Sequence, residues 1–297
     1  MPLRRLAALC LALWPAAAPA EVPRVVADIA PVHSLVAQVM GTLGQPELLM
    51  DRGADAHDYQ MRPSQARALA GADLLVWIGP GMTPWLARAA EGDLAGRSLV
   101  LLDVPGTTVL PFAGGAADAA GEEPAGPDPH AWLDPSNASL WLQAIAGALS
   151  EADPANAATY AANAAAAHQA IEAADDGVAA MLAPVRGQRI IVYHDALGYF
   201  AARYGLRLVQ AVAAGDAALP GAGRIAGLRD RLAGTACIFP EAGRDPGLVE
   251  TLAEGTGVRI GDPLDPEGRD LPPGPALYVQ LLQGLGRTIA ACAAPPG

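Results

Sequence analysis

The sequence contains no lysine, and its 19 basic residues, all arginines, stand against 31 Asp and Glu residues. The formal net charge is −12. Binding to phosphates requires a basic face, so this balance argues against nucleic acid as a partner. After the first twenty residues, no stretch of about 20 apolar residues runs without a charge or a Pro/Gly break, which argues against a membrane-spanning helix.

Cysteine is also scarce, with three residues in the chain: Cys10, Cys237 and Cys292. The first lies in a segment with an early pair of arginines, a short apolar stretch and the small-residue sequence "APA". These features are typical of a secretory signal peptide over residues 1–20, cleaved after Ala20. We therefore expect an exported, soluble protein in the periplasm.

Export leaves Cys237 and Cys292 in an oxidising compartment, where two cysteines favour one disulfide. It would tie the strand-like stretch "CIFPE" to the last helix. Closing a loop of this length, about 55 residues, stabilises a fold by roughly 4 kcal/mol in the chain-entropy model. The alternative is a metal site with two cysteines and one histidine, but no CxxC is present and no histidine follows His194.

Short apolar runs alternate with helical patterns in both halves of the chain, which predicts parallel sheets covered by helices. Between the halves, an alanine-rich helix is predicted from Asp153-Pro154 to Leu182. At 1.5 Å per residue it would span about 43 Å, long enough to act as a strut. We predict an α/β fold of two doubly wound lobes, residues 21–152 and 184–297, joined by the helix at 153–183.

The chain has five histidines, and three of them lie close to the carboxyl side of predicted strands. His57 follows "PELLM", His130 lies in "DPHAWLDP", and His194 ends "RIIVYH". Asp265 in "GDPLDPEG" again lies just past a strand, with Asp262 as the reserve candidate. In doubly wound sheets these strand edges line the ligand crevice, so we expect the four side chains to meet between the lobes.

Three neutral imidazoles and one carboxylate are a donor set for tetrahedral Zn²⁺, whereas manganese prefers more oxygen. Nearby Asp58, Asp128 and Asp195 are candidates to orient the imidazoles, or else are solvated or cap helices. The remaining histidines, His33 and His168, lie within predicted helices and are expected to be structural. For Trp77, Trp85 and Trp132, core packing is favoured over lining the cleft.

The same donors also allow an enzyme. Three histidines and a water would form the catalytic set of a periplasmic zinc hydrolase, with Glu241 as a candidate base. If Asp265 occupies the fourth position, however, no coordination site remains for water. A surface adhesin is a third reading.

Four segments resemble, in the same order, those of the zinc/manganese substrate-binding proteins of ABC transporters. They are "GADAHDYQMRPSQARALAGADLLVWIGPGMTPWL", "DPHAWLDPSNA", "YHDALGYFAARYGL" and "PEAGRDPGLVETLAEGTG". The resemblance covers nearly all of the chain after the signal peptide. It implies two α/β lobes joined by a long rigid helix, with a metal ion held between them.

Carried over residue by residue, the resemblance implies that His57, His130 and His194 are ligands. "LDPEG" is similar to the family's "LDPLG", which makes Asp265 the fourth. Manganese-type relatives usually carry a carboxylate where this chain has His194, so the resemblance implies zinc. It also places Cys237 and Cys292 where the zinc branch often has a disulfide.

One feature departs from many zinc-branch members: residues 113–127 contain no histidine, where those members carry a long histidine-rich loop. In this the chain resembles members that receive zinc from a periplasmic chaperone. The resemblance implies a monomer, not an enzyme, that captures zinc and delivers it to an ABC permease in the inner membrane. The alternatives are a manganese-binding transporter component or an adhesin of the same fold.

Overall fold

The computed structural model describes residues 22–294, apart from residues 52, 55, 57–58, 93, 95, 113–125 and 214–221. Its N-terminal half contains β1 (Val25–Ala27), α1 (Ala30–Met40), β2 (Glu47–Leu48), α2 (Pro63–Ala70), β3 (Leu74–Trp77), α3 (Pro84–Glu91), β4 (Ser98–Val100) and α4 (Pro135–Ala152). Its C-terminal half contains α5 (Ala157–Leu182), β5 (Arg189–Val192), α6 (Gly198–Tyr204), β6 (Arg207–Ala211), α7 (Ala222–Arg231), β7 (Cys237–Phe239), α8 (Gly247–Ala253), β8 (Arg259–Ile260) and α9 (Leu277–Ala293). Short 3₁₀ helices are η1 (Leu101–Asp103), η2 (Ala131–Leu133), η3 (Pro154–Asn156) and η4 (Ala183–Val185).

Proline marks the first turn of each of the helices α1 to α4. The first helical positions have no intrahelical partner for their N–H groups, so proline costs no hydrogen bond there. The N-cap of α4 is Asp134, whose side chain accepts from Ser136 N at 2.9 Å. At the other end of α1, Gly41 adopts φ 58°, a conformation that glycine reaches without a Cβ clash.

Each half of the chain builds one four-stranded sheet, and both sheets have the same topology. The strand orders are β2-β1-β3-β4 and β6-β5-β7-β8, and every pairing within them is parallel. Parallel strands place all their carboxyl ends at one edge of the sheet. The predicted α/β class with two parallel sheets is confirmed.

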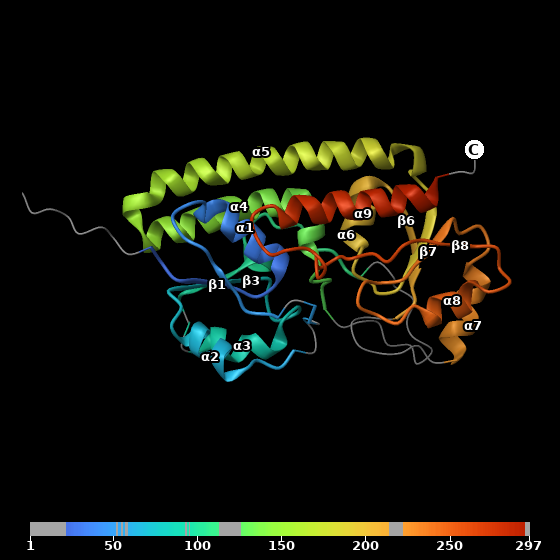
Figure 1. Ribbon diagram of the computed structural model, residues 1–297, viewed down its shortest axis with the longest axis horizontal. Helices are drawn as coiled ribbons and strands as arrows, with labels where there is room; N and C mark the ends of the chain where they lie inside the picture. The colour runs from blue at the N-terminus through green and yellow to red at the C-terminus, as the bar shows by residue number, and fades with distance from the viewer. Residues whose placement is uncertain are drawn as a thin grey trace, which may run out of the picture.

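Helix α5 runs along one side of the molecule, past the regions of both sheets, and α9 lies beside it (Figure 1). Its buried side chains recur every three or four residues and so form one face, which packs against α1, α4 and α9. They are Tyr160, Ala164, Ala167, Ile171, Ala174, Asp175, Val178 and Leu182. A single cluster of buried residues therefore extends from the first sheet through these helices to the second.

The C-terminal helix contacts both halves. Although α9 follows the second sheet in the chain, it packs against α1, and Tyr278 N donates to Ser34 Oγ at 3.1 Å. The predicted lobe boundaries at residues 152/153 and 183/184 remain predictions. Among the described residues, no helix is both long enough and apolar enough to cross a membrane.

The predicted disulfide is present. Cys237 on β7 is bonded to Cys292 on α9, with Cα atoms 6.2 Å apart and a sequence separation of 55. The bond fastens the middle of the second sheet to the helix that packs on α5. Residue Cys10 and the predicted signal peptide lie outside the described residues.

One local detail differs from the expected elements. Helix α5 begins at Ala157 and not at Pro154, because η3 occupies the turn after Asp153. In the first half, β4 ends at Val100 and η1 follows it directly.

Candidate metal centre

The structure brings His130 and His194 together, although 64 positions separate them in the chain. Their ring centroids lie 4.9 Å apart and the ring planes meet at 80°. His130 directly precedes η2, and His194 follows β5 by two residues. Both side chains are buried, with 0% and 4% exposure. Two imidazoles from opposite halves of the chain therefore face each other inside the molecule.

The orientation of His130 is set by Asp128. Its ring Nδ1 lies 2.7 Å from Asp128 Oδ1, and the same oxygen accepts from the His130 backbone N–H at 2.9 Å. A carboxylate accepts but does not donate, so this contact places the ring proton on Nδ1. The Nε2 atom then carries the lone pair that a metal ion requires.

His194 has a similar arrangement with a different carboxylate. Its Nδ1 lies 3.2 Å from Oε2 of Glu241, which follows β7 by two residues. Burial acts to raise the pKa of Glu241, but the hydrogen bond from His194 and the charges of His194, Arg269 and Arg244 outweigh burial and lower this pKa. Glu241 therefore remains a carboxylate, and Nε2 of His194 is also left as the lone-pair atom.

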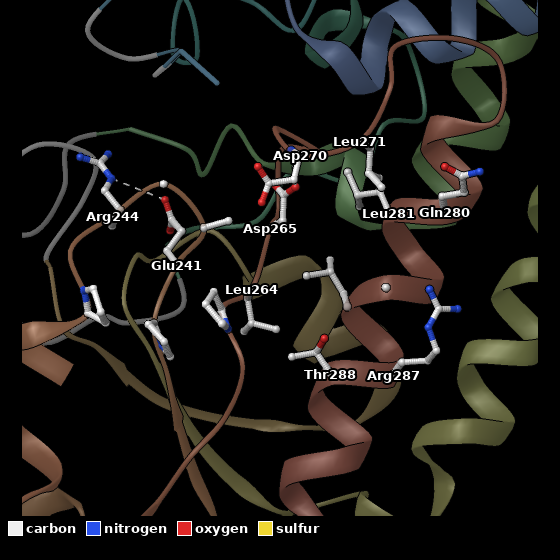
Figure 2. A pocket seen from close by; sticks show the side chains of 17 residues that line it. Glu241, Arg244, Leu264, Asp265, Asp270, Leu271, Gln280, Leu281, Arg287 and Thr288 are labelled. Atoms are coloured by element: carbon white, nitrogen blue, oxygen red, sulfur yellow. Dashed lines mark hydrogen bonds and ion pairs between the residues drawn. The ribbon is translucent and has the colours of Figure 1, made fainter. Parts of the chain in front are cut away.

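Asp265 is positioned by backbone amides. Its Oδ1 accepts from Arg269 N at 2.9 Å, and its Oδ2 accepts from Asp270 N at 3.0 Å. The side chain lines a cavity of about 750 Å³ together with Glu241 (Figure 2). Across the described residues, no three His, Cys, Asp or Glu side chains are placed so that they could hold one metal ion. The reserve candidate Asp262 is exposed.

The fourth predicted ligand, His57, lies outside the described residues, as does Asp58. The positions on either side of them both contact Trp85. Its indole N–H donates to the carbonyl of Ala56 at 2.9 Å, and its ring lies 5.2 Å from the ring of Tyr59. The chain around position 57 is thus anchored to α3.

Trp132 connects His130 to the segment that carries Asp265. The indole and imidazole centroids are 5.2 Å apart, and the indole N–H donates to the carbonyl of Pro266 at 2.9 Å. Trp132 is fully buried and Trp77 nearly so, whereas Trp85 is partly buried. Core packing therefore describes Trp132 and Trp77, and the first of them also contacts a candidate ligand.

The two remaining histidines have structural contacts. His33 Nε2 lies 3.1 Å from the carbonyl of Pro46, and burial lowers the pKa of His33. His168 is half-exposed on α5, 3.5 Å from Glu172 one turn later. Of the other carboxylates considered, Asp128 contacts a candidate ligand, and Asp195 is buried next to His194 in the chain.

Sequence reasoning missed a group of charged side chains beside His194. Arg269 donates to both carboxylate oxygens of Glu267, at 2.7 and 3.2 Å, and its Nη2 is 4.0 Å from Glu241. Glu267 is almost completely buried, and burial raises its pKa. The signal for this group is local: "EGR" follows Asp265 after a single proline.

Two parallel α/β units, a long helix along both, and paired histidines between them define a metal-type substrate-binding protein. The model of the ZnuA family, described as "Zinc-uptake complex component A periplasmic", matches residues 25–292. The chain therefore belongs to this family. Membership in a family of transport components decides against the hydrolase alternative.

Individual relatives agree with this assignment. The high-affinity zinc uptake system protein ZnuA of Paracoccus denitrificans is 47% identical over 315 residues, covering 96% of each chain. The protein of the same name from Brucella abortus is 34% identical, covering 90% of this chain and 91% of its own. A solved zinc-bound ZnuA deletion mutant superimposes with a TM-score of 0.77 at 25% identity, covering 93% of this chain and all of that one.

Proposed function

We propose that this protein captures Zn²⁺ in the periplasm and delivers it to an ABC-type permease. The observation that carries the proposal is the buried pair His130 and His194, 4.9 Å apart between ring centroids. Each ring has its Nδ1 against a carboxylate, so each presents Nε2 as a donor. Two relatives named for zinc uptake, at 47% and 34% identity, support the choice of cargo.

The proposed ligand set is His57, His130, His194 and Asp265. Two of these already face each other, and Trp132 joins His130 to the segment of Asp265 through Pro266. The Asp265 carboxylate accepts one amide hydrogen bond on each oxygen, from Arg269 and Asp270. Lone pairs remain on both oxygens, so Asp265 can bind the metal ion while these hydrogen bonds orient it.

Zinc is favoured over manganese by the donors themselves. Imidazole nitrogen is a good ligand for zinc, while manganese is better served by carboxylates, carbonyls and water. At His194 this chain supplies nitrogen. With Asp265 as the fourth ligand, the site would be tetrahedral and closed to water, which suits a carrier and not a catalyst.

Further parts of the proposal concern partners and export. Membership in a transport family implies an ABC permease as the receiving partner. We also propose cleavage of the signal peptide after Ala20, a monomeric protein, and loading by a periplasmic chaperone. The last rests on the histidine-free segment 113–127.

The test is metal binding by the purified mature protein and by four alanine variants, at His57, His130, His194 and Asp265. We expect one equivalent of zinc in the wild type, retained against excess Mn²⁺. Each histidine variant should lose more affinity than the roughly 100-fold upper figure for changes outside the ligand shell. Wild-type affinity in the His130 or His194 variant would overturn the proposed site.

A further inference from the structure

Glu241 lies between a candidate zinc ligand and an open cavity. One carboxylate oxygen, Oε2, is 3.2 Å from Nδ1 of His194. The residue also lines the cavity of about 750 Å³ between the end of β7 and helix α9. Figure 2 shows Glu241 on one side of this cavity and Gln280, Leu281 and Thr288 of α9 on the other. The carboxylate therefore contacts a candidate ligand on one side and borders the cavity on the other.

Two arginines lie within ion-pair distance of this carboxylate. Arg244 Nε is 3.7 Å and Arg269 Nη2 is 4.0 Å from Oε1, the oxygen that does not face His194. Arg269 is itself held by Glu267 through two hydrogen bonds, at 2.7 and 3.2 Å. Because Glu241 and Glu267 are both buried, solvent screens these charges poorly.

We infer that Glu241 is the positioning residue of the zinc site, an inference that rests on His194 being a ligand as proposed above. Glu241 keeps the proton of His194 on Nδ1 and fixes the plane of the ring. The lone pair on Nε2 is thereby kept available for the metal ion. Without the carboxylate, the proton is free to move to Nε2, where it blocks coordination.

This role differs from that of the neighbouring carboxylates. Asp128 orients the other histidine from a position two residues away in the same turn. Glu241 reaches His194 across the sheet, from β7 to the adjacent strand β5. The orientation of His194 therefore depends on tertiary structure, and it can be lost without unfolding the segment that carries the histidine.

The principal test compares Glu241→Ala and Glu241→Gln with the wild type, using zinc competition with a chelator. Loss of an outer carboxylate typically weakens metal binding about 10–100-fold, and we expect this loss for Glu241→Ala with one equivalent still bound. Glu241→Gln keeps an acceptor without the charge, so its loss should be smaller. Thr288→Val is the matched control, since it removes another polar side chain from the same cavity, on α9; its zinc affinity should match the wild type.

Two further readouts separate positioning from a general structural role. In the metal-free protein, ¹⁵N NMR of the imidazoles should show His194 protonated on Nδ1 in the wild type and largely on Nε2 in Glu241→Ala. Because the cavity leads to Glu241, added formate or acetate should restore part of the zinc affinity of Glu241→Ala. Neither anion should affect Thr288→Val.

Unchanged zinc affinity and an unchanged His194 tautomer in Glu241→Ala would overturn the inference. If Glu241→Ala fails to fold, Glu241→Gln decides through the same two measurements. The His194→Ala variant keeps this failure distinct from a failure of the proposed function. If zinc affinity falls strongly in His194→Ala but in neither Glu241 variant, only the positioning role is rejected. If zinc affinity is unchanged in His194→Ala, the proposed site itself is rejected.

Discussion

The two sheets share one topology, and in both a polar contact joins the end of the first strand to the end of its neighbour, the third. In the first sheet, Asp28 directly after β1 accepts from the backbone N–H of Ile78, directly after β3, at 3.0 Å. In the second, His194 after β5 contacts Glu241 after β7. The same place in the fold thus carries a hydrogen bond between strand ends in one half and a candidate metal ligand in the other.

The partners of the carboxylate make the difference. Burial raises the pKa of Asp28 to about 7, and the neutral donors around it, Ile78, Ile29 and Thr83, only partly offset that rise. Glu241 is also buried, yet His194, Arg269 and Arg244 lower its pKa. Neutral hydrogen bonds thus do not keep a buried carboxylate as acidic as cations do. A charged anchor for a metal ligand is therefore found in the second sheet.

The largest expected effect comes from the disulfide, which fastens the second sheet to α9. The double variant Cys237→Ser/Cys292→Ser should lower the free energy of unfolding by about 4 kcal/mol, because the unfolded chain is no longer restricted by a 55-residue loop. Urea denaturation measures this change. A loss below about 1 kcal/mol would mean that residual structure already restricts the unfolded chain without the bond.

A pH effect should distinguish the first sheet. The folded-state pKa of Asp28, about 7, exceeds its ordinary value of 3.8, so the folded protein binds more protons between these values. Its contribution to stability is present at low pH and is lost as the pH rises through this window. In Asp28→Asn that loss is absent. From pH 5 to pH 8 the free energy of unfolding of the wild type should therefore fall by about 2–3 kcal/mol relative to that of the variant.

Urea titrations of both proteins at the two pH values provide the measurement. The comparison between them cancels the contributions of other groups, including His33 with its lowered pKa. If the difference in free energy of unfolding between wild type and variant stays constant from pH 5 to pH 8, the pKa of Asp28 is not raised by burial. The contrast between the two sheets would then be lost.

A smaller effect is expected from Trp85, which anchors the chain on both sides of residues 57–58 in the first half. Trp85→Phe keeps a ring but loses the hydrogen bond to Ala56, worth about 1 kcal/mol, or roughly a fivefold change in an equilibrium constant. We expect zinc affinity to fall by about that factor. Trp77→Phe is the control, since its lost partner is Ser98 at 2.8 Å within the sheet. If Trp85→Phe and Trp77→Phe lower zinc affinity equally, the hydrogen bond of Trp85 has no specific effect on the site.

The smallest effect should follow replacement of the two histidines with structural contacts. His33→Gln and His168→Gln should each leave zinc affinity within about twofold of the wild type, well below the effect of an outer-shell change. Their side chains contact Pro46 and Glu172, not the paired imidazoles. Isothermal titration calorimetry suffices for this measurement. A marked loss in either variant would place a second zinc site on α1 or α5.

Much of the fold could be predicted from particular residues. The alternation of apolar runs and helical patterns predicted both parallel sheets, and the alanine-rich segment after Asp153-Pro154 predicted α5. Two cysteines in an exported chain predicted the bond between Cys237 and Cys292. These features depend on local periodicity, or on having a single pair to join, so one sequence is enough to find them.

The surroundings of the candidate site were less accessible. The sequence offers Glu241 only as a candidate catalytic base and gives no role to Glu267 or Arg269. Their roles depend on β7 lying next to β5, and on the segment after β8, where Leu264 forms a parallel bridge with Glu241. The position of the Asp265 carboxylate is set by the local turn, because the amides of Arg269 and Asp270 donate hydrogen bonds to it.

By itself, the sequence determined the α/β class, the central helix, the disulfide and which histidines follow strands, because each of these is encoded in residue type and spacing. Only the tertiary structure decided which side chain meets which: His130 with His194, His194 with Glu241, and Asp28 with Ile78. The physical reason is that hydrogen bonds and charges act over a few ångströms, and strand order sets which remote positions come that close.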